Sequence, residues 1–314
     1  MGLKRFLKFV LPWTITLTVF VIFFSRIRFS EVLEVLKQTN VKLFFLSLLI
    51  SLFPYTCFAI VKYREILKIL GCRLSFFETL ILRIGSAPLK AIIPFKMGEL
   101  TKPAYLKKKH NLSYTRGISS VLWGYALSLF VLFFFIFIGW FLYYLEMSQR
   151  IYLALLFLFF LLLIVLLLRV EIISHFVKKF LKRLYPGEER SSKICWPKTI
   201  AILLFYSLGF ECCKLLNALL LFNALNIEIP YSAFFLFTPL TILASTLPVT
   251  FGGLGVRESA ILILFSDYAI PAKLLGVSLL IFSANRLLPI LLGLFFMKPF
   301  LSRLLNINRT GRAY

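Results

Sequence analysis

Acidic residues and histidines are scarce in this chain of 314 residues, which holds 13 Asp and Glu and two His against 36 Lys and Arg. His110 and His175 stand alone among loop charges, and the five cysteines show no Cys-x-x-Cys spacing. Metal sites need clusters of such ligands, so the sequence indicates neither a metal centre nor a cofactor. Because no phosphate loop or soluble catalytic domain is found either, we expect that the chain is not an enzyme.

Charged residues of either sign make up only 16% of the chain, whereas hydrophobic residues make up 60% and the mean hydropathy is +0.91. Soluble domains carry about 45–50% apolar and about 25% charged residues. Several apolar stretches here reach the length that a helix needs to cross a bilayer. The sequence therefore predicts an all-α polytopic membrane protein, with residues 1–314 forming a single membrane domain.

The net charge of +23 would suggest a nucleic-acid partner in a soluble protein. In a membrane protein, Lys and Arg instead crowd the cytoplasmic loops and face anionic lipid headgroups. We therefore expect no nucleic-acid partner. We expect a protein integral to the cell membrane with both termini in the cytoplasm.

Six apolar stretches predict full membrane spans. They are residues 9–25, 43–61, 118–145, 151–168, 199–225 and 274–297. With this topology, 24 basic residues lie in cytoplasmic segments, Lys62 and Lys102 among them, and 6 lie in external ones, as the positive-inside rule requires. Residues 172–184 predict a basic amphipathic helix on the membrane surface, and residues 299–314 a basic cytoplasmic tail.

Two further apolar segments, 76–99 and 231–268, are interrupted by proline, glycine and charged residues. The second contains Pro-Val-Thr-Phe-Gly-Gly-Leu-Gly-Val-Arg-Glu (248–258), and the first contains a weaker copy, Pro-Phe-Lys-Met-Gly-Glu (94–99). Proline and glycine break helical geometry, and a bilayer tolerates irregular backbone only where protein buries it or water reaches it. We predict two re-entrant hairpins. Their breaks are expected at Pro94, Gly98, Pro248, Gly252, Gly253 and Gly255.

The two interrupted segments lie about half a chain apart. Each half, residues 1–150 and 151–298, then consists of span, span, hairpin and span, in opposite orientations. Paired interruptions in corresponding halves are typical of secondary transporters with inverted repeats, and they point to the binding site. We predict two inverted repeats whose hairpins meet near the midplane.

Charged residues inside the predicted membrane segments are unbalanced. Six bases (Arg83, Lys90, Lys96, Lys214, Arg257 and Arg286) face three acids (Glu99, Glu211 and Glu258). A charge at the bilayer centre costs on the order of 3 kcal/mol, and three acids cannot pair with all six bases. An arginine fork suits phosphate oxygens, so we predict an anionic headgroup as ligand. The predicted substrate-binding residues are Arg83, Lys90, Lys96, Glu99, Arg257, Glu258 and Arg286.

Structural roles for some of these charges stay open. Lys214 lies three residues after Glu211 on one helix face, a spacing that favours a plain ion pair. Arg257 and Glu258 could cap the second helix of their hairpin. Glu99 and Glu258 could carry protons or only orient the basic residues.

The segment Thr-Leu-Pro-Val-Thr-Phe-Gly-Gly-Leu-Gly-Val-Arg-Glu (246–258), together with Pro-Phe-Lys-Met-Gly-Glu (94–99), resembles the flippase-like membrane family. That family includes the transmembrane region of lysylphosphatidylglycerol synthases and the UPF0104 proteins. The resemblance covers roughly residues 40–297 and implies movement of lipids or lipid-linked groups between leaflets. The aminoacyl-transfer domain of the full-length synthases is not found, so we expect no lipid lysylation.

The function that we expect is a lipid flippase or transporter. It would move an anionic phospholipid, or a lipid-linked substrate of the polyprenyl-phosphate type, through a basic midplane cavity. The alternative is a membrane-embedded transferase or accessory subunit that modifies lipid-linked sugars or headgroups, with Glu99 or Glu258 as its base. A third possibility is a scaffold whose embedded charges are structural.

Overall fold

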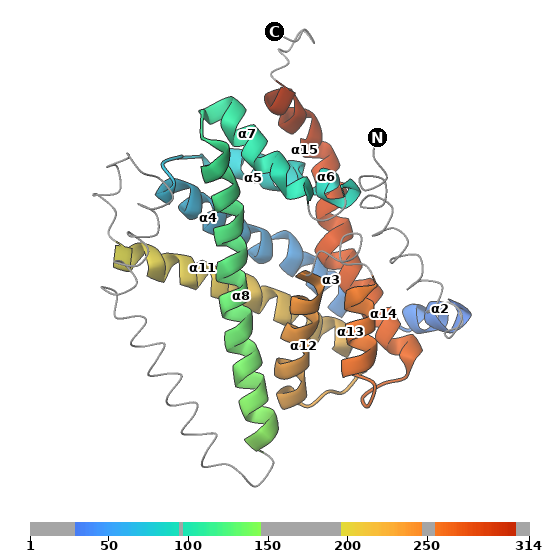
Figure 1. Cartoon of the computed structure of the whole chain (residues 1–314). Coiled ribbons are helices and arrows are strands. Elements are labelled where there is room, and N and C mark those ends of the chain that lie inside the picture. Colours follow the sequence, from blue (N-terminus) through green and yellow to red (C-terminus); the bar gives the residue numbers. More distant parts are fainter. Residues whose placement is uncertain (1–28, 94–96, 146–195, 247–254, 306–314) are drawn as a thin grey trace, which may run out of the picture.

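The computed structural model describes residues 29–93, 97–145, 196–246 and 255–305, and within these ranges the chain is helical without a strand (Figure 1). Four helical segments there are long and apolar enough to cross a membrane: Val41–Ile69, Tyr114–Tyr143, Lys198–Ala224 and Pro271–Ser302. They coincide with four of the six predicted spans and confirm the all-α polytopic fold class. The predicted spans 9–25 and 151–168, and the predicted helix 172–184, lie outside the described residues.

The first half runs from α2 to α8. Its elements are α2 (Phe29–Lys37), α3 (Val41–Leu52), α4 (Pro54–Ile69), α5 (Phe76–Gly85), α6 (Ala87–Ile92), a 3₁₀ turn (Met97–Leu100), α7 (Thr101–His110) and α8 (Tyr114–Leu145). The side chain of Asn40 caps α3 by accepting hydrogen bonds from the amides of Lys42 and Leu43 at 3.1 and 3.3 Å. Pro54 begins α4, at a position where a helix tolerates the missing N–H.

The second half begins, in the described residues, with α11. Its elements are α11 (Trp196–Ala224), α12 (Tyr231–Thr246), α13 (Val256–Leu264), α14 (Pro271–Phe282), a π-helix (Ser283–Leu287) and α15 (Leu288–Leu305). The π-helix widens the last span just before Pro289, and the amide of Leu288 bonds to the carbonyl of Ser283 five residues back. A proline cannot donate to the carbonyl four residues earlier and its ring clashes there, which accounts for the wider turn at this place.

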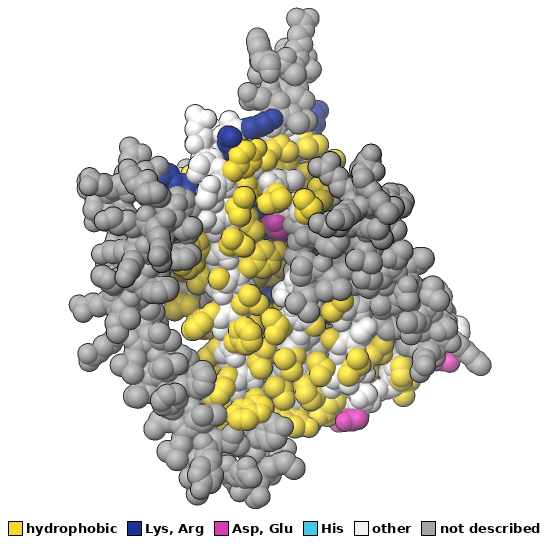
Figure 2. Space-filling model, viewed as in Figure 1, with side chains coloured by type: hydrophobic (Ala, Val, Ile, Leu, Met, Phe, Trp, Pro, Cys, Tyr) yellow, Lys and Arg dark blue, Asp and Glu magenta, His cyan; other side chains and the backbone are white. Residues whose placement is uncertain are grey.

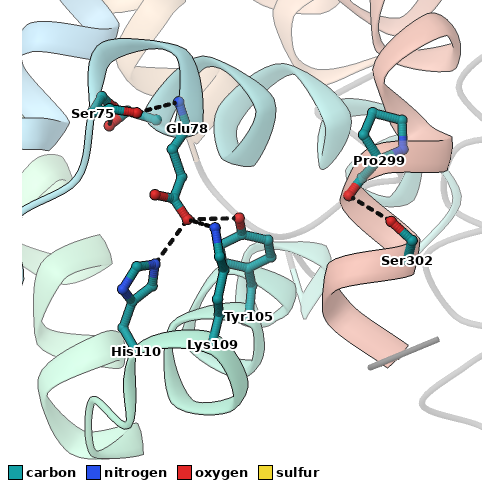
Figure 3. Close-up of polar contacts among 8 residues, drawn as sticks. Ser75, Glu78, Tyr105, Lys109, His110, Pro299 and Ser302 are labelled. Carbon is teal, nitrogen blue, oxygen red and sulfur yellow. Dashed lines mark hydrogen bonds and ion pairs between the residues drawn. The ribbon is translucent and has the colours of Figure 1, made fainter. Parts of the chain in front are cut away.

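The start of the first predicted hairpin contacts the helix that follows the hairpin. Glu78, at the start of α5, is contacted through one carboxylate oxygen, Oε1, by three donors near the end of α7: Tyr105 at 3.0 Å, His110 at 2.8 Å, and Lys109 (Figure 3). The ring of Tyr105 also stacks on Phe300 of α15 at 5.6 Å. The start of the segment is thus fixed to α7, which follows it, and the re-entrant course of residues 76–99 stays a prediction.

The second predicted hairpin is closed by aromatic packing. Phe234 near the start of α12 and Phe265 just after α13 both pack on Phe222 of α11, with ring centroids 6.3 and 4.9 Å apart. The two helices therefore lie side by side with their outer ends together. The predicted break residues Pro94, Pro248, Gly252 and Gly253 lie outside the described residues.

Each hairpin packs on the last span of the other half. The first hairpin lies against α15 through α5, and the second lies against α8 through α12, while α11 packs on α3 and α4. Figure 1 shows α5–α7 at the end of the molecule where α15 finishes, and α12 and α13 toward the opposite end. This reciprocal exchange supports the predicted inverted repeat, which stays a prediction.

The surface is apolar along its sides and basic at one end. Large hydrophobic side chains such as Phe133, Phe205 and Phe295 are exposed. Figure 2 shows hydrophobic side chains over most of the described part of one face, with Lys and Arg gathered at the upper end. Exposed Lys107, Lys108 and Lys109 belong to the α7 end. Such a surface suits lipid contact, with the basic end at anionic headgroups.

Replacement of Gly139 by alanine is expected to lower the melting temperature by at least a few degrees. A Cβ atom there would overlap the Leu236 amide nitrogen on α12, and overpacking of this kind costs about 1–3 kcal/mol. The matched control is Gly124→Ala on the same helix, where a Cβ atom would meet only the Ile66 side chain at 3.9 Å. Thermal unfolding of the purified proteins in detergent measures both, and equal melting temperatures would contradict the close packing of α8 on α12.

The Glu78 contacts predict a pH-dependent contribution to stability. Burial disfavours the ionised carboxyl, but hydrogen bonds from Lys109, His110 and Tyr105 outweigh it and hold the pKa of Glu78 below its ordinary value of 4.5. A carboxyl with a lowered folded-state pKa stabilises the fold fully above its unfolded pKa, and this contribution is lost as the pH falls through the folded pKa. Glu78→Gln should therefore destabilise the protein by about 1–2 kcal/mol at neutral pH and by less at about pH 3.

The control for this variant is Glu65→Gln. Glu65 pairs at 3.3 Å with the exposed Lys68, and exposed pairs contribute about 0–1 kcal/mol. Melting curves at both pH values compare the two variants with the original protein. A deficit of Glu78→Gln that is independent of pH would contradict the role of the ionised carboxylate.

Candidate functional site

A cavity of about 350 Å³ lies between the two halves of the described chain. Its lining comes from α3 to α8 in the first half and from α11 to α15 in the second, and it includes the π-helix. Seven basic side chains line it: Lys62, Arg83, Lys90, Lys102, Lys214, Arg257 and Arg286. Among the described lining residues Glu99 is the one acid, and the others are apolar, aromatic, hydroxyl or amide side chains.

The structure brings most of the predicted site residues to this one cavity. Arg83, Lys90, Glu99, Arg257 and Arg286 line it, although they come from separate elements of both halves. Glu258 is buried directly behind Arg257. Lys96 lies outside the described residues. Whether these side chains bind a substrate stays a prediction.

Glu99 holds two lysines from different elements. Its carboxylate lies 3.3 Å from Lys90 on α6 and 2.6 Å from Lys102 on α7. Tyr125 on α8 faces the same carboxylate. The 3₁₀ turn approaches α6 so closely that a Cβ atom at Gly98 would lie 2.5 Å from the Lys90 Cα atom, which explains the glycine in this motif. One carboxylate cannot neutralise two ammonium groups, so this cluster keeps one positive charge.

Glu258 caps the helix that carries Arg257. One carboxylate oxygen, Oε2, accepts a 2.6 Å hydrogen bond from the Gly255 amide, and the other, Oε1, accepts bonds from Arg257 at 2.7 Å and from Ser278 at 3.1 Å. Gly255 has a φ of +89°, a conformation that favours glycine. The predicted helix cap therefore describes what Glu258 does. Arg257 nevertheless still reaches the cavity wall.

Phe210 on α11 gathers three cations around one ring. Lys62 and Lys214 each have their ammonium nitrogen 5.0 Å from the ring centroid, and the Arg83 guanidinium carbon lies 5.5 Å from it. Tyr55 stacks on the same ring at 4.6 Å. The predicted ion pair between Lys214 and the fully buried Glu211 is confirmed. Lys62 also donates a 2.8 Å hydrogen bond to Ser128.

The π-helix positions Arg286. Its neighbour Asn285 accepts a 3.1 Å hydrogen bond from Ser51 on α3, and Ser51 in turn accepts one of 2.6 Å from Asn217 on α11. This buried chain ties the π-helix to both halves. Among the described residues no carboxylate pairs with Arg286 or Arg83. Wide turns of this kind are frequent at functional sites.

Sequence reasoning missed Lys62 and Lys102, and the loop positions predicted for them are wrong. Lys62 lies inside α4, and Lys102 in the first turn of α7; both are buried. After Lys62, apolar residues continue at helical spacing through Tyr63, Ile66 and Leu67, a signal that the span extends beyond residue 61. Lys102 follows Glu99 by three residues, the spacing of an ion pair.

The geometry fits binding of an anion better than metal chemistry. In the described part of the chain no three His, Cys, Asp or Glu side chains come together as metal ligands. Guanidinium and ammonium groups in a site of low dielectric make strong, charge-assisted hydrogen bonds to phosphate or carboxylate. Ser120 and Thr241 line the same cavity, but their hydroxyls donate to the carbonyls of Gly117 and Thr238 at 2.6 and 2.8 Å. The buried Thr238 hydroxyl makes no hydrogen bond to a described residue and can add a neutral donor.

Comparison with protein families gives a match over most of the chain. A family model described as the lysylphosphatidylglycerol synthase TM region matches residues 9–293. Comparison with curated proteins gives no match.

The Glu258 contacts predict a large loss of stability on truncation. Glu258→Ala removes the helix cap and leaves Arg257 buried without its ion pair, a change that costs about 3–5 kcal/mol. Glu258→Gln keeps an acceptor for the Gly255 amide and should lose less. Thermal unfolding in detergent ranks the two variants, with the exposed Asp267→Asn as control. If Glu258→Ala melted with the control, Glu258 would not be the cap of α13.

Proposed function

The chain belongs to the lysylphosphatidylglycerol synthase TM region family, and from this premise we propose that it moves an anionic lipid between the leaflets of its membrane. The headgroup passes through the basic cavity, while the lipid chain stays in the apolar surroundings. The substrate is an anionic phospholipid or a lipid-linked compound of the polyprenyl-phosphate type. The protein itself supplies the path and not a chemical reaction.

The observation that carries this proposal is the excess of cations around one cavity inside an apolar body. Arg83 and Arg286 come from opposite halves, line the same cavity and pair with no carboxylate among the described residues. Unpaired charges are costly within a bilayer, and those that persist there mark substrate pathways. An anionic headgroup would supply the missing negative charge during its passage.

The helix arrangement supports a path between the leaflets. The two hairpins are closed at opposite ends of the molecule (Figure 1), and both contribute to the cavity through Arg83, Lys90 and Arg257. In transporters built from inverted repeats, alternating access comes from one repeat rocking against the other around a fixed midplane site. The reciprocal packing of hairpins and spans would allow such a motion without exposing the bound headgroup to hydrocarbon.

A leaflet-exchange assay tests the proposal. Full-length protein is reconstituted into vesicles containing a fluorescent anionic phospholipid, and the fraction of label that an external reductant quenches is followed with time. We expect the protein to accelerate exchange. Arg83→Ala and Arg286→Ala should each reduce the rate about tenfold or more, since a hydrogen bond to a charged group contributes about 1.5–3 kcal/mol.

The matched control is Lys108→Ala, which removes an equal charge from an exposed position at the end of α7. Its rate should equal that of the original protein. Equal rates for cavity and surface variants that have the original melting temperature would contradict the proposed path. Acceleration by none of the proteins, with any anionic lipid, would contradict transport itself.

A further inference from the structure

The cations of the cavity fall into three clusters, each of which contains one carboxylate. Glu99 is shared by Lys90 and Lys102. Glu211 pairs with Lys214, beside Lys62 and Arg83 at the Phe210 ring. The third cluster consists of Glu258, its partner Arg257, and Arg286, which lines the same cavity.

Every cluster holds more cations than acids. The Glu99 and Glu258 clusters each keep one excess positive charge, and the Phe210 cluster keeps two. Seven lining cations therefore face three carboxylates in the described part of the chain, which leaves four positive charges uncompensated. Without the charges of both Lys62 and Lys90 the excess would still be two. A ligand with a single negative charge would leave at least one of these charges unpaired.

A buried donor beside this site also has no partner among the described residues. The Arg257 Nε atom is buried and makes no hydrogen bond, although Arg257 is 8% exposed and lines the cavity. Leaving a buried donor unsatisfied is costly, so a ligand oxygen that reached the Arg257 guanidinium would relieve this cost. Phosphate offers several acceptor oxygens at once, and the planar guanidinium can meet two of them.

We propose that the cavity selects a lipid whose headgroup carries at least two negative charges on phosphate, a phosphomonoester or a diphosphate, over a phosphodiester with one. This inference rests on the proposed function and narrows its substrate class. Arg83 with Lys62 binds the phosphate from the first half, and Arg286 with Arg257 binds it from the second. A cavity of about 350 Å³ lies within the size range of small-ligand sites and can enclose a diphosphate.

Binding to the purified full-length protein in detergent tests the selection. The probes are two lipids with the same acyl chains, phosphatidic acid as the phosphomonoester and phosphatidylglycerol as the phosphodiester, with farnesyl diphosphate as a third. At neutral pH we expect phosphatidic acid to bind about tenfold more tightly than phosphatidylglycerol, and the diphosphate at least as tightly as phosphatidic acid. Equal affinities, or tighter binding of the phosphodiester, would overturn the inference and leave lipid transport standing.

The charge of the phosphomonoester provides an internal check. Its second pKa is near 6, so at about pH 5 it carries little more than one negative charge. The preference for phosphatidic acid should then shrink several-fold, whereas phosphatidylglycerol, titrating far lower, reports any change in the protein. A preference that is independent of pH would mean that the cavity reads headgroup size rather than charge.

Variants assign the preference to the two arginines. Arg83→Ala and Arg286→Ala should each reduce the ratio of the two affinities several-fold, and Arg83→Lys should restore part of it because lysine keeps the charge but lacks the fork. Lys108→Ala is the control. Since the ratio compares two lipids on one protein preparation, partial unfolding leaves it unchanged. A ratio that no cavity variant alters would overturn the assignment.

Soluble anions separate a lipid ligand from free phosphate. Inorganic pyrophosphate has the same phosphate chemistry as farnesyl diphosphate but no chain, and we expect it to compete at least tenfold more weakly. Equal competition would support the charge selection of the cavity and contradict lipid as its ligand, and with it the proposed function.

Discussion

The constraint on which the rest of this structure depends is the cost of holding cations inside a membrane protein. Seven Lys and Arg side chains meet around one cavity, and only three carboxylates lie among them in the described chain. Simple pairing would have been the cheapest arrangement, because an unpaired charge in low dielectric carries a large desolvation penalty. Instead, three carboxylates serve seven basic side chains, and the Phe210 ring is an additional, weaker partner for three of them.

The irregular helices follow from that arrangement. Three of the charged side chains at the cavity come from places where a helix begins, ends or widens. Glu99 lies in a 3₁₀ turn, Arg257 in the first turn of α13, and Arg286 in a π-helix. Each is supported by specific contacts: the close approach at Gly98, the Glu258 cap, and the Ser51–Asn285 hydrogen bond. Breaks of this kind leave backbone N–H and C=O groups without helical partners. In a bilayer such groups must be buried in protein or face a cavity, and these three breaks lie at the cavity.

Much of this could be predicted from the sequence because hydrocarbon is a severe solvent. The length of an apolar stretch determines where a span lies, so the bounds of the four spans in described residues were predicted within a few residues. The exception is the C-terminal end of Val41–Ile69, which extends beyond the predicted residue 61. The embedded charges Arg83, Lys90, Arg257 and Arg286 were equally visible, since a base in the middle of an apolar run is costly in a bilayer and therefore stands out. Lys62 and Lys102 were not, because a base near the end of a span is ambiguous until the helix face it occupies is known.

What the sequence could not show is which charges meet. Lys62, Arg83 and Lys214 belong to three helices, and all three contact the aromatic ring of Phe210. Nothing in the sequence distinguishes Phe210 from the other phenylalanines, of which the chain has 36 in all. For Glu258 the sequence left a helix cap and the orientation of basic residues as open alternatives. The carboxylate both caps α13 and pairs with Arg257, and one pattern of residues is compatible with either role alone.

Because each hairpin packs on a span of the other half, the order of synthesis determines when each hairpin can make its final contacts. The first hairpin rests on α15, through contacts as late in the chain as Phe300, whereas α12 rests on α8, which is made well before it. The segment around Glu78 therefore lacks its contacts with α15 until synthesis has passed Phe300. Since the chain grows from its N-terminus at about 5–20 residues per second, that interval lasts on the order of ten seconds or more. During it, the cationic residues of the first half have no second half to shield them, and lipid headgroups are the nearest counter-ions.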